Sequence, residues 1–310
     1  MKRGLFLISI MTGLLLNLSG FGSQVQIAYQ NALDYIKKGD FEKALDWLEI
    51  VIKDFPKTQQ AKKAKVLKAV ILGGEIETSL FLLTEKLHQA LQTAVLRENQ
   101  EKILKLFLTH LKRILKRAFE FKKTLKEILA LAGTPLEIEA TFPSLSEMEL
   151  YRAVRADRYL EFGIAPSSLE MEALENQARI LKMKSLFYEM IGISTEEQLE
   201  NMPELFKASS KKGKIVWDKA LIRLGNLLLT MTIFCDVTKE RENEFPIPEL
   251  KNLSWNEIEK MYLVAQDLFK KVNFLTKDNI YSKSYLFSLK RIDEIDGALK
   301  KVREKKKLPR

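Results

Sequence analysis

Residues with the chemistry for catalysis are few in this chain, and their spacing matches none of the common reaction centres. The sequence contains two histidines, His88 and His110, and one cysteine, Cys235. A closed zinc site takes four ligands, which these three residues cannot supply. The sequence also has no glycine-rich phosphate loop and no Gly-x-Ser-x-Gly elbow. We therefore predict no metal, no cofactor and no enzymatic activity.

Carboxylates are abundant, so a catalytic acid could still be present among them. A helical enzyme that cuts cell-wall polymers would need one glutamate in a cleft, with a raised pKa. Most acids here stand beside lysines, as in Glu42-Lys43 and Glu85-Lys86, which is typical of a solvated helix face. A helical cell-wall hydrolase is therefore kept as a remote alternative.

The elements that must position any functional residue are expected to be helices. Leu, Ile, Lys and Glu dominate, and the chain has only 13 Gly and 8 Pro. No segment is expected to form a sheet, because none shows a clear two-residue alternation. We predict an all-α fold of stacked antiparallel helix pairs.

Residues 28–56 are expected to form a helical hairpin. Gly39 suits the end of the first helix and Asp40 the N-cap of the second, while Pro56 stops the second helix. Small and bulky apolar residues recur at fixed spacing around this turn. The repeat-packing positions are Ala32, Tyr35, Gly39, Phe41, Ala44, Leu48, Val51 and Pro56.

This pattern resembles one tetratricopeptide repeat (TPR), and the chain resembles TPR-like proteins of the bacterial cell envelope. Two positions depart from the family pattern, since Ala28 stands where Trp is common and Asn31 where Leu is common. The resemblance implies a surface that holds other molecules. It continues faintly through Ala61 and Ala64 to a predicted helix end at Gly73-Gly74, and then it fails.

Beyond that point the sequence predicts less regular helices. Two are expected within residues 75–132, and a break is expected at residues 97–100. A helix that contains Ala220 and one that contains Ala265 form either a degenerate repeat or an ordinary helix pair. The predicted organisation is a TPR-like region at 24–132, an irregular connection with a short helix at 133–168, a helical region at 169–299 and a basic, solvated tail at 300–310.

The N-terminus is expected to direct export. Lys2 and Arg3 precede a mainly apolar run from Leu5 to Leu18, which is typical of a signal peptide. Small residues predict cleavage near Gly22, and an uncleaved anchor is the alternative. The expected location is the periplasm or cell envelope.

The net charge of +10 is concentrated in two places. Residues 97–127 carry ten basic and four acidic side chains, and residues 300–310 carry seven basic and one acidic. These stretches could bind an anionic membrane or cell-wall polymer, or they could simply be solvated. No nucleic-acid partner is expected for an exported chain.

The leading functional hypothesis is an exported, non-catalytic TPR-like scaffold that binds a protein or peptide partner. The first helix of each pair lines the concave face of such stacks. Polar and basic residues there could bind a peptide backbone or a carboxylate. The predicted partner-binding residues are Tyr29, Asn31, Lys38, Lys62 and Lys65.

Overall fold

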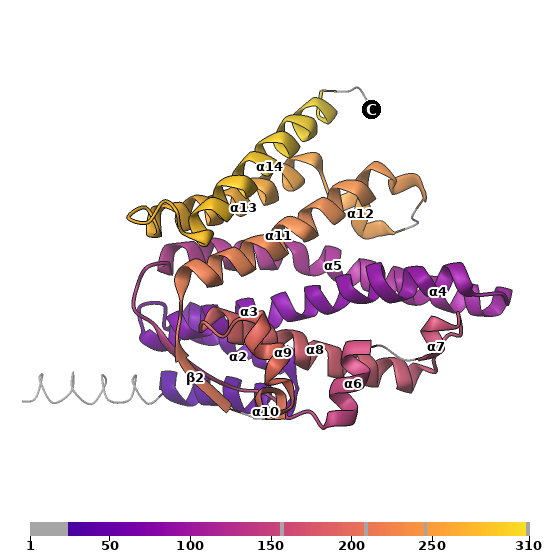
Figure 1. The fold of residues 1–310 in the computed structure, drawn as a ribbon, viewed down its shortest axis with the longest axis horizontal. Helices are drawn as coiled ribbons and strands as arrows, with labels where there is room; N and C mark the ends of the chain where they lie inside the picture. Colours follow the sequence, from indigo (N-terminus) through magenta and orange to yellow (C-terminus); the bar gives the residue numbers. More distant parts are fainter. Residues whose placement is uncertain (1–23, 156–157, 208–209, 245–246, 308–310) are drawn as a thin grey trace, which may run out of the picture.

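The computed structural model describes residues 24–155, 158–207, 210–244 and 247–307 (Figure 1). The signal peptide predicted at residues 1–22 lies outside these residues. After a first helix over residues 24–38, the elements are α2 (Phe41–Asp54), α3 (Gln59–Phe81), the π-helix η1 (Leu82–Leu87), α4 (His88–Thr93), α5 (Arg97–Leu131), β1 (Glu137–Thr141), α6 (Glu147–Arg155), α7 (Arg158–Glu161), α8 (Ser168–Met190), α9 (Thr195–Glu200), α10 (Met202–Lys207), β2 (Ser210–Lys214), α11 (Trp217–Glu240), the 3-10 helix η2 (Glu242–Glu244), α12 (Pro248–Asn252), α13 (Trp255–Leu275) and α14 (Lys283–Lys305).

The all-α character predicted from composition is confirmed. Local signals start several of the helices. The side chain of Asp40 accepts a hydrogen bond from Lys43 N, and that of Thr58 accepts one from Ala61 N. Ser167 and Glu170 form a reciprocal capping box at the start of α8.

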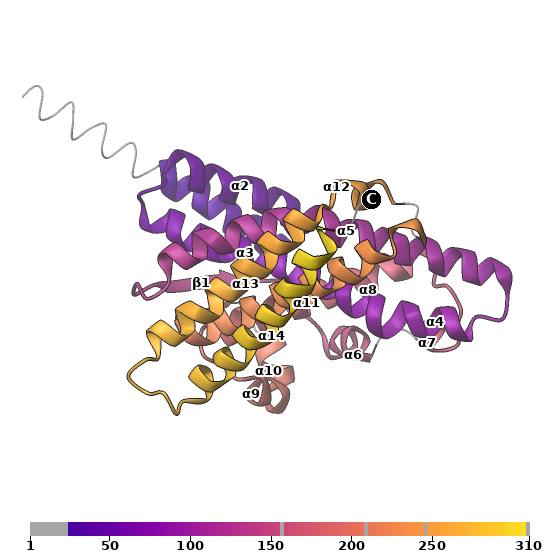
Figure 2. The same ribbon diagram turned by 90° about the horizontal axis from the view of Figure 1, so that it is seen from above.

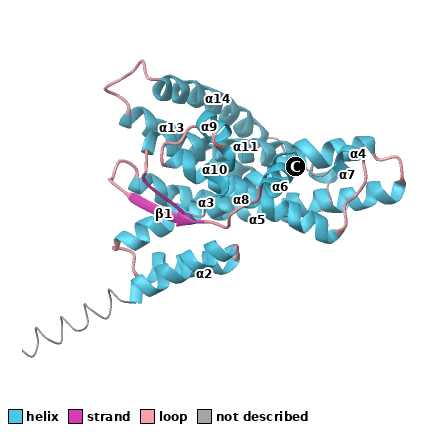
Figure 3. Ribbon diagram, turned by 60° about the horizontal axis from the view of Figure 1, so that its bottom comes forward, coloured by secondary structure: helices cyan, strands magenta, loops and turns pink. Residues whose placement is uncertain are grey.

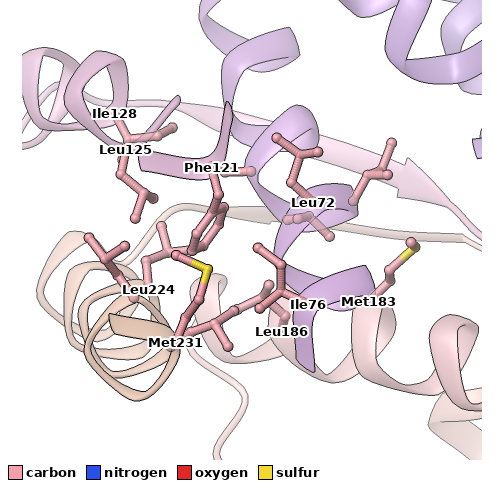
Figure 4. Packing of buried hydrophobic residues seen from close by; sticks show 14 of the residues in the cluster. Leu72, Ile76, Phe121, Leu125, Ile128, Met183, Leu186, Leu224 and Met231 are labelled. Carbon is pink, nitrogen blue, oxygen red and sulfur yellow. The ribbon is translucent and has the colours of Figure 1, made fainter. Parts of the chain in front are cut away.

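Helix α3 is the centre of the fold. It is buried on nearly every side and packs against α2, α5 and α8. In Figure 4, Leu72 and Ile76 of α3 lie beside Phe121 of α5 and Leu186 of α8, and Leu125 of α5 lies beside Leu224 of α11. Figure 2 shows from above how the other long helices gather around it.

The predicted helix end at Gly73-Gly74 is wrong. Both glycines lie in the middle of α3, which continues through η1 and α4 to Thr93. They are there because α8 passes very close. A Cβ atom on Gly74 would lie 2.3 Å from Met183 Cγ, and one on Gly73 would lie 2.7 Å from Leu186 Cδ2. The glycines therefore permit a helix crossing instead of ending a helix.

The N-terminal hairpin has the geometry expected of the two helices. Gly39 has a φ of 77°, a conformation that glycine adopts without strain, and it joins the first helix to α2. Ala32 and Ala44 have no exposed surface, which lets the two helices approach closely. Of the other repeat-packing residues, Phe41, Leu48 and Val51 are buried, Tyr35 is half-buried and Pro56 is exposed.

The expectation that no segment forms a sheet is also wrong. β1 and β2 pair antiparallel, with Glu137 opposite Lys214 and Thr141 opposite Ser210 (Figure 3). In β1, Ile138 and Ala140 are buried while the glutamates beside them are exposed. The signal was one short alternation, inside the connection that we expected to be irregular.

Helices α11, α13 and α14 pack in sequence as a C-terminal layer (Figure 1). A Cβ on Gly225 of α11 would lie 3.0 Å from the ring of Phe269 on α13, so this pair also depends on a glycine. Residues 300–305 of the predicted solvated tail belong to α14. Lys305 Nζ lies 2.7 Å from Asp236 Oδ1, and Lys306 Nζ lies 2.7 Å from Glu259 Oε2. Much of this basic charge is thus paired within the fold.

Candidate binding groove

The five predicted partner-binding residues lie on the first helix and on the first two turns of α3, and their exposure differs. Tyr29 is 6% exposed and belongs to the core, so it offers little surface to a partner. Asn31 and Lys62 are half-buried. The structure brings none of the five into the two hollows described below.

The remaining two of these residues already have contacts within the chain. Lys65 Nζ lies 3.7 Å from Glu127 Oε2 on α5. Lys38 is exposed, with its Nζ 5.5 Å from the ring centre of Tyr35. The surface of the N-terminal hairpin thus offers scattered polar groups instead of a shaped site.

A groove of about 510 Å³ lies between α11 and the continuous helical run of α3 and η1. We call it the α11 groove. One wall is a stripe of α11 with members three or four residues apart. The stripe runs from Arg223 to Val237, which corresponds to about 21 Å of helix. Its apolar members are Leu227, Ile233, Phe234 and Val237.

The stripe is partly apolar, and its apolar side chains are unevenly covered, since Leu227 is buried and the second half is more exposed. Ile233 is 47% exposed and Val237 is 50% exposed, while Thr230 between the turns is also exposed. Among the described residues, α11 alone is long and apolar enough to cross a membrane, and a core helix passes the same test. Its most apolar stretch has a mean hydropathy of 1.5, but only 56% of it is buried. A helix of this composition is normally covered on all sides.

The opposite wall includes the start of the π-helix. Leu80 and Phe81 at the end of α3 line the groove, followed by Thr84 and Glu85 of η1. A π-helix widens the backbone and occurs often at functional sites. Lys182 Nζ stands 5.0 Å from the ring centre of Phe81, so a cation already covers part of this wall.

Charged residues close the end of the groove near α8. Arg223 lies 2.6 Å from Glu77 and 2.8 Å from Glu189, and Lys182 lies 3.5 Å from Glu77. Burial alone would lower the pKa of Arg223, but the two carboxylates raise it, so the guanidinium stays charged. These charges neutralise one another. The exposed Glu85 has no ion pair among the described residues and leaves the rim slightly acidic.

A serine, a histidine and a glutamate stand in line inside the fold. His110 Nδ1 is 3.4 Å from Ser79 Oγ, and His110 Nε2 is 3.0 Å from Glu175 Oε1. This is the order of groups in a nucleophilic triad. However, Ser79 and His110 have no exposed surface and line neither hollow, so the hydroxyl cannot reach a substrate. The arrangement ties α3, α5 and α8 together.

The ion pairs of Glu175 predict acid sensitivity. Burial raises its pKa, but His110 and Arg113 outweigh this and lower the pKa to about 2. Since the unfolded value is 4.5, the carboxylate stabilises the fold above that pH and the stabilisation is lost as the pH falls. Between pH 5 and pH 3 the loss from this group is about 2 kcal/mol. In urea unfolding, the free energy of unfolding of Glu175→Gln should therefore fall less between pH 5 and pH 3 than that of the unmodified protein. An unchanged fall in this free energy would contradict the role given to Glu175.

The cysteine and the potential metal ligands of the described residues are buried or dispersed. Cys235 is buried, and its burial, together with Asp236, raises the pKa of the thiol to about 12. Within the described part of the chain, no three His, Cys, Asp or Glu side chains gather in a way that could hold a metal ion.

Among the described residues, two carboxylic acids have a raised pKa because of burial, Glu75 and Glu189, and of these Glu75 lines one of the two hollows. Glu75 is 3% exposed, and its burial raises the pKa while Arg117, with Nε 2.9 Å away, opposes this. It lines the second hollow together with Glu42. The sequence marked out no particular glutamate, because the burial of Glu75 depends on α5 and α8.

The groove was not predicted from the sequence. The sequence predicted a helix that contains Ala220, and the groove beside this helix exists only because α3, η1 and α8 pack next to it. Comparison with known proteins adds no assignment, since no protein-family model, curated protein or solved structure matches this chain.

Proposed function

We propose that this chain is a non-catalytic helical scaffold that binds an amphipathic helix of a protein partner in the α11 groove. The observation that carries the proposal is the groove wall on α11, about 21 Å long, in which the apolar side chains of Ile233 and Val237 lie about half exposed, one helical turn apart. An amphipathic helix fills such a groove with apolar residues three and four positions apart. Basic residues on its polar face would meet Glu85.

The proposal keeps two finer expectations from the sequence. The first is that the hairpin of residues 24–54 is one TPR-like unit in a divergent stack, which the burial of Ala32 and Ala44 supports. The second is export to the periplasm or cell envelope, which rests on the apolar run from Leu5 to Leu18. Both remain proposals, as does the nature of the partner.

The test uses a fluorescent peptide of about 16 residues with leucines on one helical face and lysines on the other. Ile233→Glu and Val237→Glu should each weaken binding about tenfold or more, because a charge then faces the apolar side of the peptide. Fluorescence anisotropy gives the dissociation constants.

Two controls make the result specific. Leu286→Glu, on α14 and outside the groove, changes a side chain that is 53% exposed and should alter affinity less than about twofold. A scrambled peptide of the same composition should bind weakly. Equal losses for all three variants, or equal binding of the scrambled peptide, would refute the groove.

A second candidate function, a cell-wall hydrolase, is favoured only by Glu75. Its pKa is raised and it lines a hollow, as a general acid requires. Release of soluble fragments from purified peptidoglycan, abolished by Glu75→Gln, would support this candidate. A complete lack of turnover between pH 4 and 8 would eliminate it.

A further inference from the structure

The second hollow, of about 470 Å³, lies over the middle of α5, and we call it the α5 cavity. Two adjacent turns of α5 place Lys112, Arg113, Lys116 and Arg117 in its wall, and α8 adds Arg179. It shares no lining residue with the α11 groove. A partner in the groove would therefore leave these cations uncovered.

Three carboxylates neutralise Arg117. Its guanidinium pairs with Glu42, with Glu75 at 2.9 Å and with Glu120 at 3.2 Å. Arg113 has one close carboxylate, Glu175, at 2.9 Å. These two arginines are therefore structural, and neither is available to capture an anion without losing a partner.

The other three cations of the cavity have fewer or more distant carboxylate partners. Arg179 reaches Glu175 only at 3.9 Å, and Glu175 is already held by Arg113. Lys112 and Lys116 are exposed and form no ion pair within the described part of the chain. Like charges one helical turn apart repel, so an anion between these lysines would stabilise α5.

The opposite edge of the cavity is polar and can accept hydrogen bonds. Glu249 and Asn252 of α12 line it. Glu249 Oε2 is shielded from solvent and meets no donor among the described residues, which is costly for a carboxylate. Hydroxyl groups on a ligand would supply donors here. The cavity thus offers cations on one side and acceptors on the other.

We infer that the α5 cavity binds a phosphate ester that carries hydroxyl groups. The phosphate lies against Lys112, Lys116 and Arg179, and the hydroxyl groups point toward Glu249. The volume suits a ligand of about the size of a sugar phosphate. The same chemistry occurs in free sugar phosphates and in the headgroup of phosphatidylglycerol.

Calorimetry with glucose 1-phosphate tests the inference. Lys112→Gln/Lys116→Gln should weaken binding at least tenfold. Lys123→Gln/Lys126→Gln removes the same charge from exposed positions of the same helix outside the cavity. This control should change the affinity for glucose 1-phosphate less than twofold. Equal losses in the two double variants, or no saturable binding up to 10 mM ligand, would overturn the site.

Two further arms define the ligand and its source. Glu249→Gln should weaken the binding of glucose 1-phosphate but not the binding of inorganic phosphate. Equal effects on the binding of both ligands would overturn the predicted hydroxyl contacts. Vesicles of phosphatidylglycerol that compete with glucose 1-phosphate would identify a lipid headgroup, and an absence of competition would identify a free ester. Both outcomes support the site. Val237→Glu should leave this binding unchanged, which separates it from the groove.

Discussion

Replacing Arg117 with methionine should lower the free energy of unfolding by about 3–5 kcal/mol. The side chain of Arg117 is 11% exposed and joins α2, α3 and α5 through Glu42, Glu75 and Glu120. Without it, Glu75 would be a buried carboxylate that has lost its nearest cation. The penalty should shrink toward acid pH, because Glu75, whose pKa is already raised, would then take up a proton.

Urea unfolding at pH 7 measures this effect. The double variant Arg117→Met/Glu75→Gln should regain much of the loss, since the unpaired charge is gone. As a matched control, Arg241→Met breaks an exposed pair with Glu244 and should cost less than about 1 kcal/mol. A loss at Arg117 no larger than that at Arg241 would show that the network is not a stabilising centre.

Gly74→Ala should destabilise the fold by about 2–3 kcal/mol, and Gly74→Leu by more than about 3 kcal/mol. The added Cβ would lie 2.3 Å from Met183 Cγ and 3.1 Å from the backbone of the same residue. The helices α3 and α8 would have to move apart. A new rotamer of Met183 would move its Cγ, but the backbone atoms at 3.1 Å can yield only if the two helices shift.

Gly297→Ala is the internal control for this prediction. Gly297 lies within α14, and a Cβ there meets nothing within 4 Å. Alanine should stabilise α14 by about 0.5–1 kcal/mol through its helix propensity. In thermal unfolding, Gly74→Ala should lower the unfolding temperature and Gly297→Ala should raise it. A stabilising Gly74→Ala would mean that α3 and α8 are not in close contact.

These glycines also show what the sequence could predict. The hairpin at residues 28–56 carried consistent local signals, a glycine turn and small residues at fixed spacing, and the helices lie where those signals place them. Gly73-Gly74 carried the same local signal of a helix end. Its different meaning depends on Met183, more than a hundred residues away in the chain.

The strand β1 was missed for a similar reason. Five residues of alternation are too few to distinguish a strand from a loop, and the pairing strand β2 contains mostly lysines and glycine. The partner of β1 is supplied by tertiary structure. Long-range contacts likewise decide which acids are buried, and they placed Glu75 and Glu175 where no local pattern indicated a role.

The binding surfaces were harder to predict than the fold. Sequence reasoning assigned the partner to Tyr29 and its neighbours because they occupy the first helix of a repeat. Exposure depends on what else covers that helix, and Tyr29 is buried. Conversely, the sequence analysis assigned no binding role to α11, and its partly exposed stripe is evident only when the neighbouring helices are in place.

Methyl-resolved NMR of the chain during titration with the leucine–lysine peptide tests the central proposal most directly. The methyl signals of Ile233 and Val237 should shift progressively, together with that of Leu80 on the opposite wall. Those of Leu286 and Leu289 on α14, outside the groove, should stay in place. Shifts of equal size on α14, or no shifts at Ile233 and Val237 at saturating peptide, would contradict a helix-binding groove on α11.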